Sequence, residues 1–283
     1  MTTSARDRWL PLLAFAGAWF LAILAFGVTI IGGGKDGLVD ANTYWSASRG
    51  PMYSDDYVLW TRGYSYPPPF AQLFALVSWP PYEIFRWIWL GVALLAYTWL
   101  LRPVRPVVAI PLIFAAWVLC ADNLYWILAL VAVFSFRFPS LWAVPLLTKI
   151  TPGVGVLWFP VRGEWRSFAI ALASTALVAG VSVLIVPELW AQWLSLMLRQ
   201  DIGGTGTTNF FLTVPPLTLR VAVAAVLVAW GARTDRRWVI PVSMLIAQPD
   251  IAFSTFGVLA AIPRLRQPEP APRPLAIPQG VAA

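Results

Sequence analysis

Two carboxylates stand just after the first long apolar run of the sequence, where a membrane-spanning segment would meet water. The run Trp9 to Ile31 has about 23 almost uninterrupted apolar residues, enough to cross a bilayer, and Asp36 and Asp40 follow it. Further on, residues 66–70 read Tyr-Pro-Pro-Pro-Phe, a rigid extended element that opens another apolar run. This pattern tethers an acid and an aromatic, proline-rich turn to one membrane face, which suits chemistry on lipid-linked substrates.

Asp40 is the candidate general base for such a reaction, because transfer of a group to an alcohol requires removal of the alcohol proton. The alternative is that Asp40 caps a short helix that follows it, and taken alone the local sequence favours the cap. Asp36 is a rival base, but the glycines around it indicate a solvated loop. Asp55 and Asp56 could hold a divalent cation, although a solvated surface explains this pair better. We predict no cofactor and no metal ligand, and leave a metal requirement open.

Positive charge is needed if the leaving group is a phosphate. Lys149 lies among prolines and apolar residues, where an ammonium group is costly unless it meets a partner or a polar cavity. Its alternatives are snorkelling to the interface or a structural salt bridge. Arg62, Arg199 and Arg220 could each offer a bidentate guanidinium to a phosphate, and Arg220 stands early in an apolar run.

Composition predicts an all-α, polytopic membrane protein. Hydrophobic residues make up 59% of the 283 residues and charged residues 12%, and the mean hydropathy is +0.71. The absence of His excludes His-based catalysis and His metal sites, and Cys120, the one cysteine, has no partner for a disulfide within the chain. The net charge of +7 comes from arginines at the ends of apolar segments, which is the topogenic pattern, so no nucleic-acid partner is expected.

The arginines also orient the chain. With Arg6 and Arg8 cytoplasmic, the first run is a retained span, and the chain has about 8 to 10 membrane segments in all, with the short run 69–79 as a juxtamembrane helix. The runs 139–160 and 238–263 are interrupted, at Lys149 and at residues 248–250, and we interpret each as a broken hairpin. Residues 32–81 and 187–213 form two extracytoplasmic loops. Residues 1–266 make one membrane domain, and 267–283 are predicted to be a disordered, Pro-rich cytoplasmic tail.

Short motifs carry a resemblance to a known family. They are Asp40-x-x-x-Tyr44, Gly50-x-x-Tyr53, Tyr66-Pro67-Pro68, Lys149-Ile-Thr-Pro152 and Asn209. In this order they resemble the polyprenyl-phosphate-mannose-dependent mannosyltransferases of glycosyltransferase family 87, which have the GT-C membrane fold. The chain departs from the family pattern in three ways. It is shorter, it lacks the Gly and Gln of a polar element near Asp122 and Asn123, and it lacks a His-bearing pattern near residues 248–250.

The resemblance implies an inverting enzyme that moves a hexose, with mannose expected, from a polyprenyl phosphate carrier to a glycolipid or polysaccharide acceptor. It favours Asp40 as the base over the cap. It assigns donor or substrate binding to a set of residues: Lys149, Arg62, Arg199, Arg220, Asn209, Tyr44 and Tyr66. The expected location is the extracytoplasmic face of a bacterial inner membrane, among membrane lipids. The alternatives are a carrier or flippase for lipid-linked sugars and an inactive, shortened partner subunit.

Overall fold

The computed structural model describes residues 5–31, 39–47, 49, 52–53, 64–199, 208–209, 212–213, 215–249 and 251–267. These residues are almost entirely helical, as the sequence predicts, and the exception is a two-residue antiparallel ladder of β1 (Thr208–Asn209) and β2 (Leu212–Thr213). The helices are α1 (Ala5–Ile31), α2 (Val39–Ser46), α3 (Pro68–Ala75), α4 (Tyr82–Leu101), α5 (Pro106–Cys120), α6 (Tyr125–Phe134), η1 (Pro139–Trp142), α7 (Ala143–Leu146), η2 (Thr151–Leu157), α8 (Trp158–Val161), α9 (Trp165–Ile185), α10 (Pro187–Arg199), α11 (Leu217–Arg233), α12 (Val239–Ile246), η3 (Phe253–Ala261) and α13 (Ile262–Leu265).

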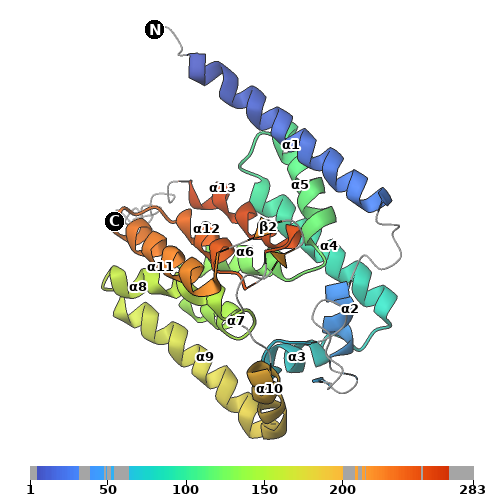
Figure 1. The fold of residues 1–283 in the computed structure, drawn as a ribbon, viewed down its shortest axis with the longest axis vertical. Coiled ribbons are helices and arrows are strands. Elements are labelled where there is room, and N and C mark those ends of the chain that lie inside the picture. The colour runs from blue at the N-terminus through green and yellow to red at the C-terminus, as the bar shows by residue number, and fades with distance from the viewer. Residues whose placement is uncertain are drawn as a thin grey trace, which may run out of the picture.

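Three helices in the described part of the chain are long and apolar enough to cross a membrane. They cover Leu10–Val28, Tyr82–Leu101 and Trp165–Ile185, and several shorter apolar helices lie between and after them. The first, α1, packs against α5 at one edge of the bundle, whereas α9 and α10 form the opposite edge (Figure 1). Helix α3 ends at Ala75, so the run 69–79 is too short for a span, as predicted. The predicted total of 8 to 10 segments remains a prediction.

Prolines mark where many of the helices begin. Helices α3, α5 and α10 start at Pro68, Pro106 and Pro187, and α4 and α11 start directly after Pro81 and Pro216. Proline suits these positions because its fixed φ matches the helix and because the first N–H groups of a helix have no intrahelical partner. The proline-rich segment at residues 67–69 therefore starts α3 and ends the loop before it.

The run 139–160 is a broken hairpin, as predicted. Gly153 lies against Leu146 and Gly155 against Trp142, so closely that a Cβ atom on either glycine would overlap the facing side chain. Each residue further along the second arm thus faces one further back in the first arm, so the arms are antiparallel. Lys149 lies in the turn between α7 and η2. The glycines allow the two short arms to touch along their length.

The run 238–263 is broken in the same way. Helix α12 ends at Ile246, η3 begins at Phe253, and the two elements pack against each other. At the open end of this second hairpin the Arg266 guanidinium lies 5.1 Å from the centre of the Trp238 ring. Gln248 lies in the turn and is fully buried.

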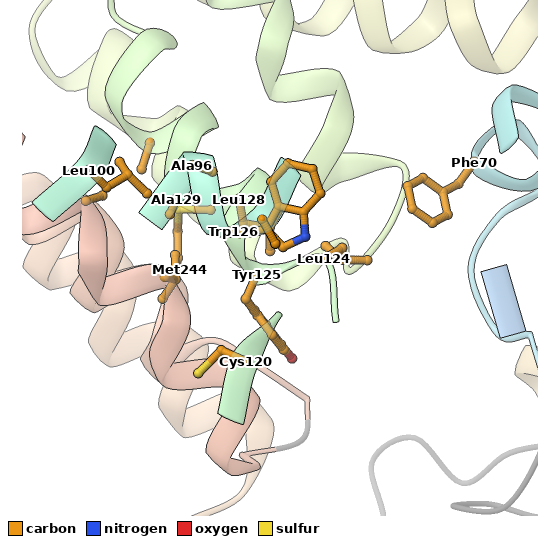
Figure 2. Close-up of a cluster of buried hydrophobic side chains, with 14 of the residues drawn as sticks. Phe70, Ala96, Leu100, Cys120, Leu124, Tyr125, Trp126, Leu128, Ala129 and Met244 are labelled. Atoms are coloured by element: carbon orange, nitrogen blue, oxygen red, sulfur yellow. The ribbon is translucent and has the colours of Figure 1, made fainter. Parts of the chain in front are cut away.

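Helix α6 occupies the middle of the bundle. It contacts η3, α4 and α12, and six of its ten residues are buried, most of them in an apolar cluster. Figure 2 shows part of this cluster, in which residues of α6 and its neighbours gather: Leu100, Cys120, Leu124, Tyr125, Trp126, Leu128, Ala129 and Met244. The helix therefore forms much of the apolar centre, with its N-terminal residue Tyr125 at one end.

Ten of the basic side chains of the described residues gather at one end of the bundle, here called the arginine end. Contacts join its elements: Arg264 donates to the Trp99 carbonyl, Arg162 bonds the Ala232 carbonyl and Asp235, and the Trp99 and Phe134 rings stack. The basic residues on these elements are Arg102, Arg105, Arg137, Arg162, Arg166, Arg233, Arg236, Arg237, Arg264 and Arg266. Both hairpins have their open ends here, so their turns lie toward the opposite end.

Candidate functional site

Helix α2 carries Asp40 in its first turn, and its N-terminus is capped from elsewhere in the chain. The Asp122 carboxylate, 82 residues further on, accepts hydrogen bonds from the main-chain N–H groups of Asp40 and Ala41, both at 3.0 Å. A carboxylate is favourable here because the first N–H groups of a helix are unsatisfied and carry positive partial charge. The interpretation of Asp40 as the cap is therefore wrong, and Asp122 has that role.

The Asp40 side chain is held by Asn123. The Asn123 amide donates a hydrogen bond of 2.6 Å to Asp40 Oδ2, while Asn123 Oδ1 accepts from the Tyr44 hydroxyl at 3.3 Å and from the Leu124 N–H at 2.7 Å. These bonds fix which end of the Asn123 amide faces Asp40. No hydrogen bond to the other oxygen, Oδ1 of Asp40, comes from the described residues, so that oxygen can accept a proton from a substrate hydroxyl.

A chain of tyrosines leads from Asp40 to Lys149. The Tyr44 and Tyr66 hydroxyls are 3.3 Å apart, and the Lys149 Nζ atom lies 5.4 Å from the centre of the Tyr66 ring and 4.7 Å from that of Tyr125. Aromatic faces attract a cation, so the two rings hold the ammonium group. Of the residues selected from the sequence, the structure thus brings four together: Asp40, Tyr44, Tyr66 and Lys149.

The turn of the first hairpin, which carries Lys149, has a strained backbone. The next residue, Ile150, has a φ of +29°, which a β-branched side chain rarely adopts. Such conformations persist where the surroundings impose them, and they cluster at functional sites. Here the close-packed arms of the hairpin fix the turn, and the Lys149 ammonium is directed at Tyr66 and Tyr125.

The turn of the second hairpin contacts Tyr125, one of the two tyrosines beside Lys149. The Tyr125 hydroxyl donates to Gln248 Oε1 at 3.3 Å, and the main-chain carbonyls of Gln248 and Pro249 accept hydrogen bonds from the Arg220 guanidinium. Sequence reasoning missed Tyr125 and Gln248 as site residues. The available signal was that both hairpins break at polar residues, which must find partners if they are buried.

The structure describes the other predicted substrate-binding residues only in part. Arg220 is buried and directs its described hydrogen bonds to main-chain carbonyls near the second turn, so it ties α11 to that turn. Its predicted contact with phosphate stays a prediction. Asn209 lies in β1 and Arg199 at the end of α10, and their side chains are outside the described part of the structure, as is all of Arg62. Asp36, Asp55 and Asp56 also lie outside it.

The site has an accessible layer and a buried layer. Asp40, Asp122, Tyr66 and Lys149 are partly exposed. Beneath them lie side chains with almost no exposed surface: Tyr44, Asn123, Tyr125 and Gln248. The partly exposed groups are therefore the ones that can touch a ligand, and the buried ones hold them in place.

Burial shifts the ionisation of this site. Burial, and then the nearby charge of Asp40, raise the pKa of Asp122 to about 7. Burial likewise raises the pKa of the Tyr66 hydroxyl, against the opposing effect of Lys149. Tyr66 is therefore neutral at physiological pH and can both donate and accept a hydrogen bond. Among the described residues, no group of three His, Cys, Asp or Glu side chains is placed to hold a metal ion.

The arrangement places a carboxylate and an ammonium group in one site. When it is ionised, Asp40 is a carboxylate that only accepts hydrogen bonds. The Lys149 ammonium group interacts electrostatically with it. A carboxylate can take a proton from an alcohol, and an ammonium can stabilise negative charge on a departing group. Together they suit transfer of a group from an anionic carrier to an alcohol.

The comparison with protein families gives a match. The sequence profile of glycosyltransferase family 87 matches residues 64–277, more than half of the chain. The match includes Tyr66, Tyr125 and Lys149 but begins after Asp40 and Tyr44. No curated protein and no solved structure matches the chain.

Proposed function

Because the chain belongs to glycosyltransferase family 87, we propose that it transfers a hexose, with mannose as the expected sugar, from polyprenyl phosphate to a glycolipid or polysaccharide acceptor. The family makes it a membrane glycosyltransferase. The observation that carries the finer proposal is the link from the Asp40 carboxylate through Asn123, Tyr44 and Tyr66 to the Lys149 ammonium.

The reaction is a single displacement. Asp40 Oδ1 accepts the proton of the acceptor hydroxyl, the acceptor oxygen bonds to the anomeric carbon, and the bond from that carbon to the phosphate oxygen breaks. Lys149 stabilises the charge of the departing polyprenyl phosphate. Retention would require a second carboxylate close by as nucleophile. Asp122 is close, but both of its oxygens accept N–H groups of α2, which supports inversion.

The charge distribution supports an extracytoplasmic site in a bacterial inner membrane. Arginines prefer the cytoplasmic side of membrane proteins, and the site lies opposite the arginine end. The same asymmetry argues against a carrier for lipid-linked sugars. A transport path needs polar groups through the depth of the membrane, whereas apolar residues of α6 fill the middle of this bundle.

The orientation can be tested with single cysteines in a Cys120→Ser background. We expect Ser195→Cys on α10 to react with an impermeant thiol reagent in intact cells, and Ser140→Cys and Glu164→Cys to stay unlabelled until the cells are permeabilised. The last two flank the open end of the first hairpin. Glu164 is preferable to Gly163, whose φ of +73° disfavours a side chain. Labelling of only one of this pair would show that the run 139–160 crosses the membrane once.

A transfer assay tests the function itself. Purified protein in lipid nanodiscs is given radiolabelled polyprenyl-phosphate-mannose and a bacterial membrane lipid extract. We expect label to move from the carrier to a product of different mobility, and we expect no transfer from a nucleotide sugar. Folded protein that moves no label from any polyprenyl-phosphate hexose, yet exchanges the carrier across a vesicle membrane, would contradict an enzyme and favour the carrier.

A further inference from the structure

Asp122 and Asn123 bind the main chain and the side chain of Asp40, respectively. Asp122 binds the main-chain N–H groups at the start of α2, and Asn123 binds the carboxylate of the same residue. The pair is itself anchored, because the Trp89 indole donates to the carbonyls of Ala121 at 2.8 Å and Asp122 at 3.2 Å. Helix α2 is thus attached to the turn between α5 and α6 by hydrogen bonds to adjacent residues.

We propose that Asp122 and Asn123 are positioning residues for the Asp40 base, an inference that rests on the proposed function. Asp122 sets the place of the Asp40 main chain, and Asn123 sets the plane of its carboxylate and leaves Oδ1 to the acceptor hydroxyl. Placement at this level matters, because a displacement of about 1 Å of a reacting group can cost about 10²-fold in rate.

The two hydrogen bonds from the main chain of α2 to Asp122 depend on the charge of the Asp122 carboxylate. The charged and titratable groups that face it from the described elements are Asp40 and Tyr44 on α2, and Tyr82 and Arg86 on α4. Burial and the Asp40 charge raise the pKa of Asp122 to about 7. When Asp122 takes up a proton, one of its oxygens becomes a donor, and α2 loses an acceptor for one of two N–H groups. The rate of transfer should therefore fall as the pH drops through about 7.

The test compares Asp122→Asn, Asn123→Ala and a control, Asp235→Asn, with the intact membrane protein. Asp235 is an exposed acid whose ion pair is with Arg162 at the arginine end. We expect Asp122→Asn and Asn123→Ala to lower kcat by about 10-fold to 100-fold while the donor KM changes less than twofold. In Asp122→Asn the fall of kcat near pH 7 that we assign to protonation of Asp122 should be absent. Asp122→Glu should recover part of the rate, and Asp235→Asn should behave as wild type.

A second measurement separates this inference from the proposed function. Hydrogen exchange of the peptide that covers residues 39–47 should be faster in Asp122→Asn than in wild type, while exchange in α4 and α6 is unchanged. This result does not require turnover, so it holds even if the transferred sugar differs from the proposed one. Unchanged exchange in α2, or an unchanged kcat and pH profile per folded molecule, would overturn the inference.

Discussion

Replacement of Asp40 by Asn is expected to lower the rate of sugar transfer by about 10² to 10⁴-fold, the usual cost of a lost general base. Asn keeps the size of the side chain and can still accept the hydrogen bond from the Asn123 amide. The main-chain bond from residue 40 to the Asp122 carboxylate is also retained. The fold and the affinity for the donor should therefore stay close to wild type, and the loss should fall on kcat.

The measurement is the single-turnover rate with saturating labelled donor, together with donor affinity from equilibrium binding. The matched control is Asp235→Asn, which removes a carboxylate at the arginine end, where it pairs with Arg162. This control should keep the wild-type rate. If Asp40→Asn retains half of wild-type turnover, Asp40 is not the base, and Asp36 becomes the next residue to replace.

The broken hairpins could be predicted because their cause is local in the sequence. Prolines and glycines around Lys149 cannot continue a helix, and the basic residues at both ends of the run require that the ends lie on one side. The structure adds the reason that the arms can be so close, since Gly153 and Gly155 accommodate Leu146 and Trp142. A lone sequence does not say which glycines face which side chains.

The partners of Asp40 could not be predicted, because they are set by packing between distant segments. Asp122 caps α2 although it lies 82 residues further along the chain than Asp40, and the same contact excludes Asp40 as the cap. Tyr125 is the first residue of an apolar helix, so its sequence position alone indicates an interfacial aromatic residue. Its role becomes visible only when the two hairpin turns bring Lys149 and Gln248 to it.

The geometry also joins the two parts of the chain that the family match separates. The match begins at Tyr64, so Asp40 and Tyr44 lie outside it. Inside the matched region, Asn123 bonds both Asp40 and Tyr44, and Tyr66 lies next to Tyr44. Helix α2 thus supplies the carboxylate, and the matched region supplies the residues that hold it and the Lys149 cation.

Replacement of Lys149 by Met should weaken donor binding and slow transfer together. Met keeps an unbranched apolar stem between the Tyr66 and Tyr125 rings and removes the charge. A hydrogen bond to a charged group contributes about 1.5 to 3 kcal/mol, so we expect donor affinity to fall by about 10-fold to 150-fold. The single-turnover rate should fall as well, because the charge on the phosphate grows as its bond to the sugar breaks.

Two further variants separate the charge from its surroundings. Lys149→Arg restores a cation and should recover part of both affinity and rate, although its planar fork fits less well between two rings. Arg137→Met removes a cation that lies over the Phe138 ring at the arginine end, and it should leave donor affinity unchanged. The free energy of unfolding of Lys149→Met serves as the readout of a structural role. A large loss of stability with unchanged affinity and rate per folded molecule would mean that the cation holds the two tyrosines in place and does not meet the carrier phosphate.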